Sequence, residues 1–219
     1  MNQTPSKSHW ENIYTTKDTQ KVGWFQPRPG QSISLIEELA LPKDSTIIDI
    51  GGGDSYLVDF LLADDYRNVT VLDISAKAIE KAKLRLSEKS ELPDWIVSDI
   101  REFEPSRQYD LWHDRAAFHF LIEEEDIKNY VETAKNGIIE NGWMIIGTFS
   151  DKGPTTCSGL PVRQYALEEL QQTFSPYFET VKKFNIDHIT PSGQSQNYSF
   201  CVFRKKHSAP RDLQSRGQI

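Results

Sequence analysis

Three aspartates stand where short apolar runs of the chain end, and each could hold a polar group of a ligand. Asp49 comes at the end of the run 45–50 and is followed by Gly51, Gly52 and Gly53. Glycines allow the backbone to turn sharply and a ligand to approach it closely, and the start of a helix after such a loop attracts polar groups. Asp73 and Asp99 end the next two apolar runs. The spacing therefore predicts a binding site built from acids and a glycine loop.

The chemistry of a nucleoside fits these acids. Asp73 lies 22 residues after Gly51, the place at which an acid can accept hydrogen bonds from both hydroxyls of a ribose. We predict that Asp73 and the neighbouring Ile74 contact the ribose. Asp99 could accept a hydrogen bond from an adenine amino group, with Ile100 beside the ring, although it could also cap the segment that follows it.

The residues of the glycine loop distinguish between two candidate kinds of nucleoside cofactor. A dinucleotide fingerprint requires a third small residue where Tyr56 stands, so that helix and strand can pack tightly. Asp49 would also place a carboxylate close to a pyrophosphate. A carboxylate suits a cationic amino-acid tail better, and S-adenosylmethionine carries an ammonium and a sulfonium but no phosphate. We therefore predict S-adenosylmethionine as the cofactor, and retain a nicotinamide-dependent oxidoreductase and a non-catalytic binding module as alternatives.

The elements that must position these residues alternate between strand-like and helical runs. Ser75 is placed to cap the second helix, and the helix over 123–136 opens with an acidic first turn that complements its dipole. Such alternation predicts a parallel, doubly wound α/β sheet with ligands at the carboxyl ends of its strands. The expected strands are 45–50, 68–74, 94–100, 109–114 and 141–150, and the expected helices between them are 54–65, 75–90 and 123–136.

Both ends of the chain depart from this alternation. The runs 176–188 and 197–206 read as an antiparallel hairpin. Before the first strand, residues 1–44 contain two helical stretches, which we expect to form a lid over the site. We expect one domain over 1–206, since the chain has no internal linker, and a flexible tail over 207–219, which lacks apolar periodicity.

The motifs IIDIGGGDS, TVLDIS, IVSDI and YDLWHDRAAFHFL resemble those of the class I S-adenosylmethionine-dependent methyltransferases. The resemblance covers about residues 30–206 in motif order. It implies a Rossmann-like seven-stranded sheet of order 3-2-1-4-5-7-6 with the last strand antiparallel. It also implies that Asp49 and its glycines hold the methionine part of the donor, Asp73 the ribose and Asp99 the adenine.

Aromatic residues near the N-terminus narrow this resemblance. The stretch His9 to Tyr14, followed by Gly23-Trp24-Phe25, is similar to a subgroup that contains lysine methyltransferases of elongation factors and of citrate synthase, with bacterial relatives. In this family an N-terminal helix covers the cofactor, and so we expect Tyr14 and Trp24 to contact the donor, although such aromatics are more often core residues. The subgroup has Asp-Lys-Gly where this chain has Asp114-Arg115-Ala116. The methyl acceptor therefore stays open between a small molecule and a protein lysine.

The stretch at the end of the fourth strand and beyond it is the candidate acceptor wall and the candidate catalytic region. It contains His113, Asp114, Arg115 and His119. Asp114 and Arg115 could instead form a structural pair, and His119 could be a buried core histidine. Transfer from a sulfonium needs mainly the correct placement of the reacting atoms, and a base is required only when the acceptor is protonated.

Composition limits the partners and the compartment. A net charge of −7 and a pI of about 5.3 argue against a nucleic-acid or anionic-membrane footprint, which needs a clustered basic face. Cys157 and Cys201 are too far apart in sequence to predict a disulfide framework or a metal site. The chain has no apolar run of 18 residues and no signal-like start. We expect a cytoplasmic protein without a bound metal.

Overall fold

The computed structural model describes residues 7–207, and the expected tail over 207–219 lies, apart from residue 207, outside the described residues. Seven strands form one sheet in the order β3-β2-β1-β4-β5-β9-β8. The strands β1 to β5 are parallel, and β9 is antiparallel to both β5 and β8. The predicted order and the antiparallel last strand are confirmed. The strands are β1 (Thr46–Ile50), β2 (Asn68–Asp73), β3 (Asp94–Val97), β4 (Tyr109–Arg115), β5 (Ile138–Phe149), β8 (Phe178–Ile189) and β9 (Ser195–Lys205).

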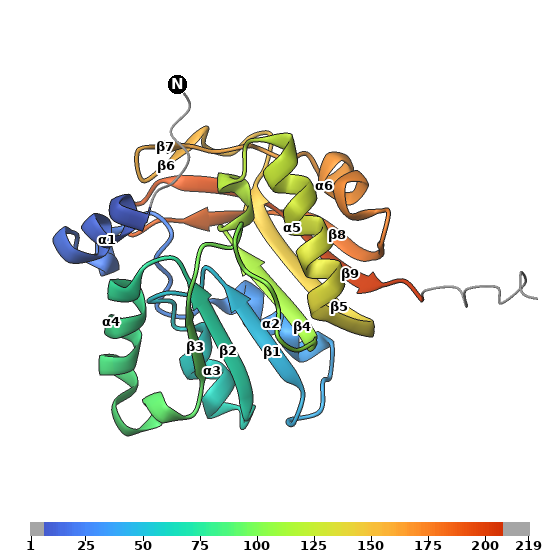
Figure 1. Ribbon diagram of the computed structural model, residues 1–219. Coiled ribbons are helices and arrows are strands. Elements are labelled where there is room, and N and C mark those ends of the chain that lie inside the picture. The colour runs from blue at the N-terminus through green and yellow to red at the C-terminus, as the bar shows by residue number, and fades with distance from the viewer. Residues whose placement is uncertain (1–6, 208–219) are drawn as a thin grey trace, which may run out of the picture.

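Helices cover both faces of this sheet (Figure 1). Alternation along β1 explains the two layers, because Ile47 packs into one apolar cluster while Ile48 and Ile50 pack into the other. The first cluster joins the sheet to α2 and α3, and the second joins it to α5 and α6. The helices are α1 (Lys7–Thr16), α2 (Gly30–Glu38), α3 (Leu57–Ala63), α4 (Ala76–Leu86), α5 (Glu124–Gly137) and α6 (Leu167–Phe174).

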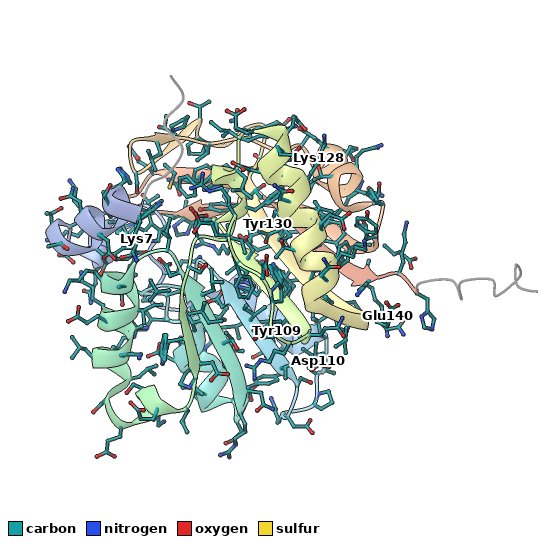
Figure 2. All side chains as sticks on the ribbon, in the orientation of Figure 1. Lys7, Tyr109, Asp110, Lys128, Tyr130 and Glu140 are labelled. Carbon is teal, nitrogen blue, oxygen red and sulfur yellow. The ribbon has the colours of Figure 1, made fainter. Side chains whose placement is uncertain are left out.

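Helix α5 lies over β4 and carries the labelled Lys128 and Tyr130, while Tyr109 and Asp110 mark the beginning of β4 (Figure 2). Helix α1 packs against α4 beside the carboxyl ends of the strands (Figure 1). The predicted site residues at the ends of β1, β2 and β4 therefore open toward the side that α1 covers.

Several elements differ from their sequence-based bounds, each for a local reason. Helix α3 begins at Leu57 rather than at residue 54, because the loop after β1 turns first and Ser55 Oγ accepts the Leu57 N–H at 3.1 Å. Strand β3 ends at Val97, so that Asp99 follows the strand rather than ending it. Helix α4 ends at Leu86, and the short helix η2 (Ser87–Glu91) follows.

Helix α6 and two short strands were not predicted. Helix α6 has an apolar face that packs Leu170 and Phe174 into the core. Between β5 and α6, the two-residue strands β6 (Thr156–Cys157) and β7 (Leu160–Pro161) pair with each other. The part of the chain that the structure describes contains no helix long and apolar enough to cross a bilayer.

Candidate functional site

Two adjoining cavities lie at the carboxyl ends of β1, β2 and β4. The strand-end cavity has a volume of about 120 Å³, and the glycine-loop cavity has a volume of about 60 Å³. Four residues line both cavities and therefore mark their boundary: Tyr14, Trp24, Gly51 and Arg115. The strand-end cavity also includes Asp73, Ile74, Asp99 and Ile100, whereas the glycine-loop cavity includes Asp49, Gly52 and His113.

The carboxylate of Asp49 is held by a buried polar chain. His113 Nδ1 lies 2.7 Å from Asp49 Oδ1, and His113 Nε2 lies 2.8 Å from Ser32 Oγ. Asp49 and His113 are neighbours across β1 and β4, and both are buried. With Asp49 ionised, Nδ1 donates to it and Nε2 accepts from the Ser32 hydroxyl. His113 therefore orients Asp49 at the glycine loop.

Asp73 ends β2 and lines the strand-end cavity. Its Oδ1 accepts the Ser75 N–H at 2.8 Å, which leaves further carboxylate lone pairs for a ligand. Burial, opposed in part by that hydrogen bond and assisted by the nearby Asp49 and Glu11, raises the pKa of Asp73 to about 7. Hydrogen-bond donors from a ligand would stabilise the ionised form.

Asp99 faces the same cavity from the loop after β3. It forms an ion pair with Arg101, whose backbone N–H also donates to Asp99 Oδ1 at 3.0 Å. This pairing fixes the carboxylate beside Ile100 while leaving acceptor capacity on its oxygens.

The glycine loop permits close approach between β1 and β2. Gly51 and Gly53 have φ values of +66° and +37°, where a side chain would be strained. A Cβ at Gly52 would lie 2.5 Å from Asp49 Oδ2, and a Cβ at Gly53 would lie 2.5 Å from Asp73 Oδ2. The glycines therefore leave room for the two carboxylates that the sequence selected, although Gly53 itself lines neither cavity.

Glu11 attaches helix α1 to the amino end of α4. Glu11 accepts hydrogen bonds from Ser75 Oγ at 2.9 Å and from the backbone N–H groups of Ala76 and Lys77 at 2.9 and 3.0 Å. Ser75 Oγ in turn accepts the Ala78 N–H, which confirms the predicted cap. Glu11 thus supplies negative charge where the helix dipole favours it.

The same segment places aromatic rings over the strand-end cavity. Trp10 packs edge-on against Trp24 and Phe120, with ring centroids 5.9 and 5.1 Å apart, and all three line the cavity. Tyr14 is buried, and burial together with the nearby Asp73 and Asp54 raises its pKa well above the usual value. Tyr14 and Trp24 both line the cavity, and their contact with the donor stays a prediction.

The chain after α1 is attached to the sheet at a second place. Arg115 Nη1 donates to the Trp24 carbonyl at 3.1 Å, and His188 Nε2 lies 2.8 Å from the Gly23 carbonyl. Burial and the nearby Arg115 lower the pKa of His188, which is consistent with a neutral imidazole that donates to a carbonyl.

The structure places only two of the four residues of the candidate acceptor wall at a cavity. Arg115 lines both cavities and His113 lines the glycine-loop cavity, but Asp114 and His119 line neither. Asp114 is fully buried and accepts hydrogen bonds from the backbone N–H groups of Ala117 and Phe118 and from the Tyr130 hydroxyl. It braces the turn after β4 and does not pair with Arg115.

His119 is also fully buried. Its Nδ1 accepts the Phe149 N–H at 3.3 Å, and its ring packs against that of Phe149, with centroids 4.6 Å apart. Burial and the nearby Arg115 lower the pKa of His119 to about 3, so that it is neutral near pH 7. These contacts match the alternative in which His119 is a core residue.

Several residues of the strand-end cavity were not among the sequence candidates. Cys157 comes from β6, and burial raises the pKa of its thiol to about 11. Phe120 lies within the stretch that the sequence singled out, but its spacing carried no functional signal. The others are Trp10, Ile50, Leu72, Ser98, Arg101, Ala116, Ala117 and Leu121.

The acids of the two cavities fit S-adenosylmethionine better than a dinucleotide. Acids at the ends of β1 and β2 and after β3 match an ammonium, a ribose and an adenine amino group. The nearest arginine to the adenine side, Arg101, is already paired with Asp99. A pyrophosphate placed at the glycine loop would meet the carboxylate of Asp49 instead of a cation.

Comparison with known proteins agrees with this geometry. A family model described as a methyltransferase domain matches residues 48–144. The chain is 26% identical over 209 residues to EEF1A lysine methyltransferase 2 of Danio rerio. The aligned region covers 88% of this chain and 83% of that protein. The fold, the site and these similarities together support a class I S-adenosylmethionine-dependent methyltransferase with S-adenosylmethionine as its cofactor.

Solved structures share the fold at low sequence identity. The N-methyltransferase NodS from Bradyrhizobium japonicum WM9, in complex with S-adenosylhomocysteine, has a TM-score of 0.69 at 15% identity, over 93% of this chain and 100% of that one. The Burkholderia thailandensis 1,6-didemethyltoxoflavin-N1-methyltransferase has a TM-score of 0.70 at 17% identity, over 92% and 87% of the two chains.

Proposed function

We propose that this methyltransferase modifies a small molecule, with the donor lying across Gly51. The observation that carries the proposal is that the two cavities meet at this residue. Asp49 would then hold the methionine part of the donor in the glycine-loop cavity. Asp73 with Ile74, and Asp99 with Ile100, would hold the ribose and the adenine in the strand-end cavity. The acceptor would enter beside Arg115.

The charges beside the proposed acceptor position favour a molecule that is not cationic. The acids that line the strand-end cavity, Asp73 and Asp99, are assigned to the donor, and the remaining charged group at the boundary of the cavities is Arg115. A lysine ammonium would be repelled by Arg115, and the remaining acid of the two cavities, Asp54, is already paired with Arg85. A neutral or anionic acceptor meets neither obstacle.

The chain's own groups would act by placement and by exclusion of water. When bound, S-adenosylmethionine supplies an activated methyl group, and so transfer depends largely on the alignment of the reacting atoms. The candidates for a base are poorly suited. His119 has a pKa of about 3, and both His119 and Asp114 lie outside the two cavities, while His113 is held between Asp49 and Ser32. The thiol of Cys157 in the strand-end cavity has a pKa of about 11. We therefore propose an acceptor atom that carries a free lone pair near pH 7.

The N-terminal segment is proposed to serve as the lid. Glu11 attaches α1 to α4, and Arg115 and His188 attach the segment around Trp24 to the sheet. These contacts place Trp10 and Tyr14 over the strand-end cavity. Residues 1–206 would act as one domain, with 1–44 closing over the bound donor.

A protein lysine is the second candidate acceptor. It is supported by the similarity to EEF1A lysine methyltransferase 2, which extends over 88% of this chain. The charge of −7 supports an acceptor that is neither a nucleic acid nor a membrane lipid. We also propose a cytoplasmic location, supported by the free thiols of Cys157 and Cys201.

Labelled S-adenosylmethionine tests the acceptor class. The protein is incubated with a cell extract that has been separated into small molecules and proteins, and an Asp73→Ala variant serves as the control that should not bind the donor. We expect label in the small-molecule fraction with the unaltered protein only. Label on a protein band would favour the second candidate. Binding of S-adenosylhomocysteine without transfer to either fraction would contradict the proposal.

A further inference from the structure

Arg115 differs from the other partly buried arginines of residues 7–207. Arg85 pairs with Asp54 and Asp59, Arg101 pairs with Asp99, and Arg163 pairs with Glu124 and Glu169. None of the ion pairs within the described part of the chain includes Arg115, although its guanidinium lies between two cavities. A guanidinium in such a place carries a full charge, and its charge is not matched by a carboxylate of the protein.

The contacts of Arg115 leave one side of its guanidinium without a partner. Nη1 donates to the Trp24 carbonyl at 3.1 Å, and the guanidinium carbon lies 4.9 Å from the ring centroid of Tyr198. Nη2 is buried and has no hydrogen-bond partner among the described residues. A buried charged donor without an acceptor is costly, and a ligand that supplies an anionic oxygen would remove that cost.

Tyr198 adds a second donor without a partner at the same place. It is 1% exposed, and no group within residues 7–207 accepts its hydroxyl proton. The hydroxyl lies close enough to Arg115 and Cys157 for both to affect its pKa, although burial dominates and raises that pKa to about 12. Tyr198 itself lines neither cavity, but Arg115 and Cys157 both line the strand-end cavity, so the hydroxyl lies behind its wall on the proposed acceptor side.

We infer that the methyl acceptor carries a carboxylate, which binds between Arg115 Nη2 and the Tyr198 hydroxyl. This inference rests on the proposed methylation of a small molecule. One guanidinium matches the single negative charge of a carboxylate, and its N–H groups suit the planar oxyanion. The rings of Trp10, Trp24 and Phe120 form the apolar part of the cavity and favour an acceptor with an aromatic or other flat apolar body.

The donor has a carboxylate of its own, and so the first test separates the two sources. Binding of S-adenosylhomocysteine and of 5′-methylthioadenosine, which lacks the amino-acid part, is measured for the unaltered protein and for Arg115→Gln. Loss of the Arg115 contact to the Trp24 carbonyl weakens both ligands through the lid, and so the inference predicts that the ratio of the two affinities changes by less than about threefold. A selective loss of S-adenosylhomocysteine affinity in Arg115→Gln would assign Arg115 to the donor and overturn the inference.

The second test uses probes for the acceptor position. Benzoate and the isosteric neutral benzamide are titrated into protein saturated with S-adenosylhomocysteine. We expect benzoate to bind about 10-fold or more tightly than benzamide, as a charge-assisted hydrogen bond requires, and Arg115→Gln to abolish the preference. Arg163→Gln is the matched control, because that arginine is paired with carboxylates and lines neither cavity. Equal binding of the two probes, or no binding of either, would contradict the inference.

Tyr198→Phe removes only the unpartnered hydroxyl and keeps the ring under Arg115. The inference predicts about 10-fold weaker benzoate binding with a melting temperature that is unchanged or higher. If the hydroxyl had a purely structural role, benzoate binding would not change. That result would remove Tyr198 from the site.

Fractionation of the natural acceptor completes the test. The small-molecule extract is passed over an anion exchanger before the labelling reaction. The inference predicts that the acceptor is retained and that its eluate restores labelling. Labelled small molecules in the flow-through would overturn the inference while the proposed function stands, whereas label on protein alone would overturn the proposed function.

Discussion

Replacing Glu11 by alanine removes the side chain that attaches α1 to α4. Its carboxylate accepts two backbone N–H groups and the Ser75 hydroxyl at the amino end of α4. Burial alone would raise the pKa of Glu11, but the hydrogen bonds from Lys77, Ser75 and Ala76 lower it overall. The ionised form is therefore the one that holds α1 in place.

The size of the effect follows from these bonds. A helix-capping interaction contributes about 1 kcal/mol, and hydrogen bonds to a charged group contribute somewhat more. Because Glu11 is only partly buried, solvent screening reduces the total to about 1–2 kcal/mol. That loss lowers the ratio of closed to open lid by about 5- to 30-fold. The apparent affinity for donor falls by up to this factor, depending on how far the closed form dominated at the start.

Titration calorimetry with S-adenosylhomocysteine measures the affinity, and amide hydrogen exchange in α1 reports the lid. Glu80→Ala is a matched control, because Glu80 is an exposed acid on α4 that pairs with Lys77. We expect Glu11→Ala to bind the ligand more weakly and to exchange faster in α1, while the control behaves as the unaltered protein. Unchanged affinity together with faster exchange in α1 would refute the coupling of the lid to donor binding.

Three further predictions concern the buried acids Asp73 and Asp114. Asp73 must be ionised to accept both ribose hydroxyls, and its pKa is about 7 in the free protein. We therefore expect the affinity for S-adenosylhomocysteine to rise about tenfold from pH 6 to pH 8. The Asp73→Asn variant should lose this pH dependence. Because its pKa is raised, Asp73 keeps its proton in the folded state to higher pH than in the unfolded state. The free energy of unfolding of the free protein should therefore fall as the pH rises from about 4 through 7. If urea titrations of Asp73→Asn showed the same fall with pH, the assignment would be contradicted. Asp114→Asn disturbs three buried hydrogen bonds and should lower the free energy of unfolding by about 2–3 kcal/mol, together with donor affinity and turnover; a loss of turnover alone would restore Asp114 to the acceptor wall.

The residues that the sequence located best are those whose role is set within a few positions. Asp49 and Asp73 follow apolar runs of parallel strands, and the carboxyl ends of such strands meet at one edge of the sheet. Ser75 was predicted as a cap from the same local pattern, and its hydrogen bond to the Ala78 N–H confirms it. Local sequence also predicted the order of strands through the resemblance of its motifs.

The contacts that the sequence did not predict join distant parts of the chain. His113 reaches Asp49 because β1 and β4 are neighbours in a particular register, and Glu11 reaches α4 across about 65 residues. Asp114 and Arg115 are adjacent in sequence, but successive side chains of a strand point to opposite faces. One therefore braces the core while the other lines the cavities, which residue types alone do not reveal.

A crystal structure of the protein with S-adenosylhomocysteine tests most directly where the donor lies. We expect both ribose hydroxyls within hydrogen-bond distance of Asp73, the adenine beside Asp99 and Ile100, and the amino-acid part at Asp49 and Gly51. We also expect Nη2 of Arg115 to stay free of the ligand's carboxylate. A ribose that makes no contact with Asp73, or an adenosine part bound outside the strand-end cavity, would contradict the proposed placement of the donor.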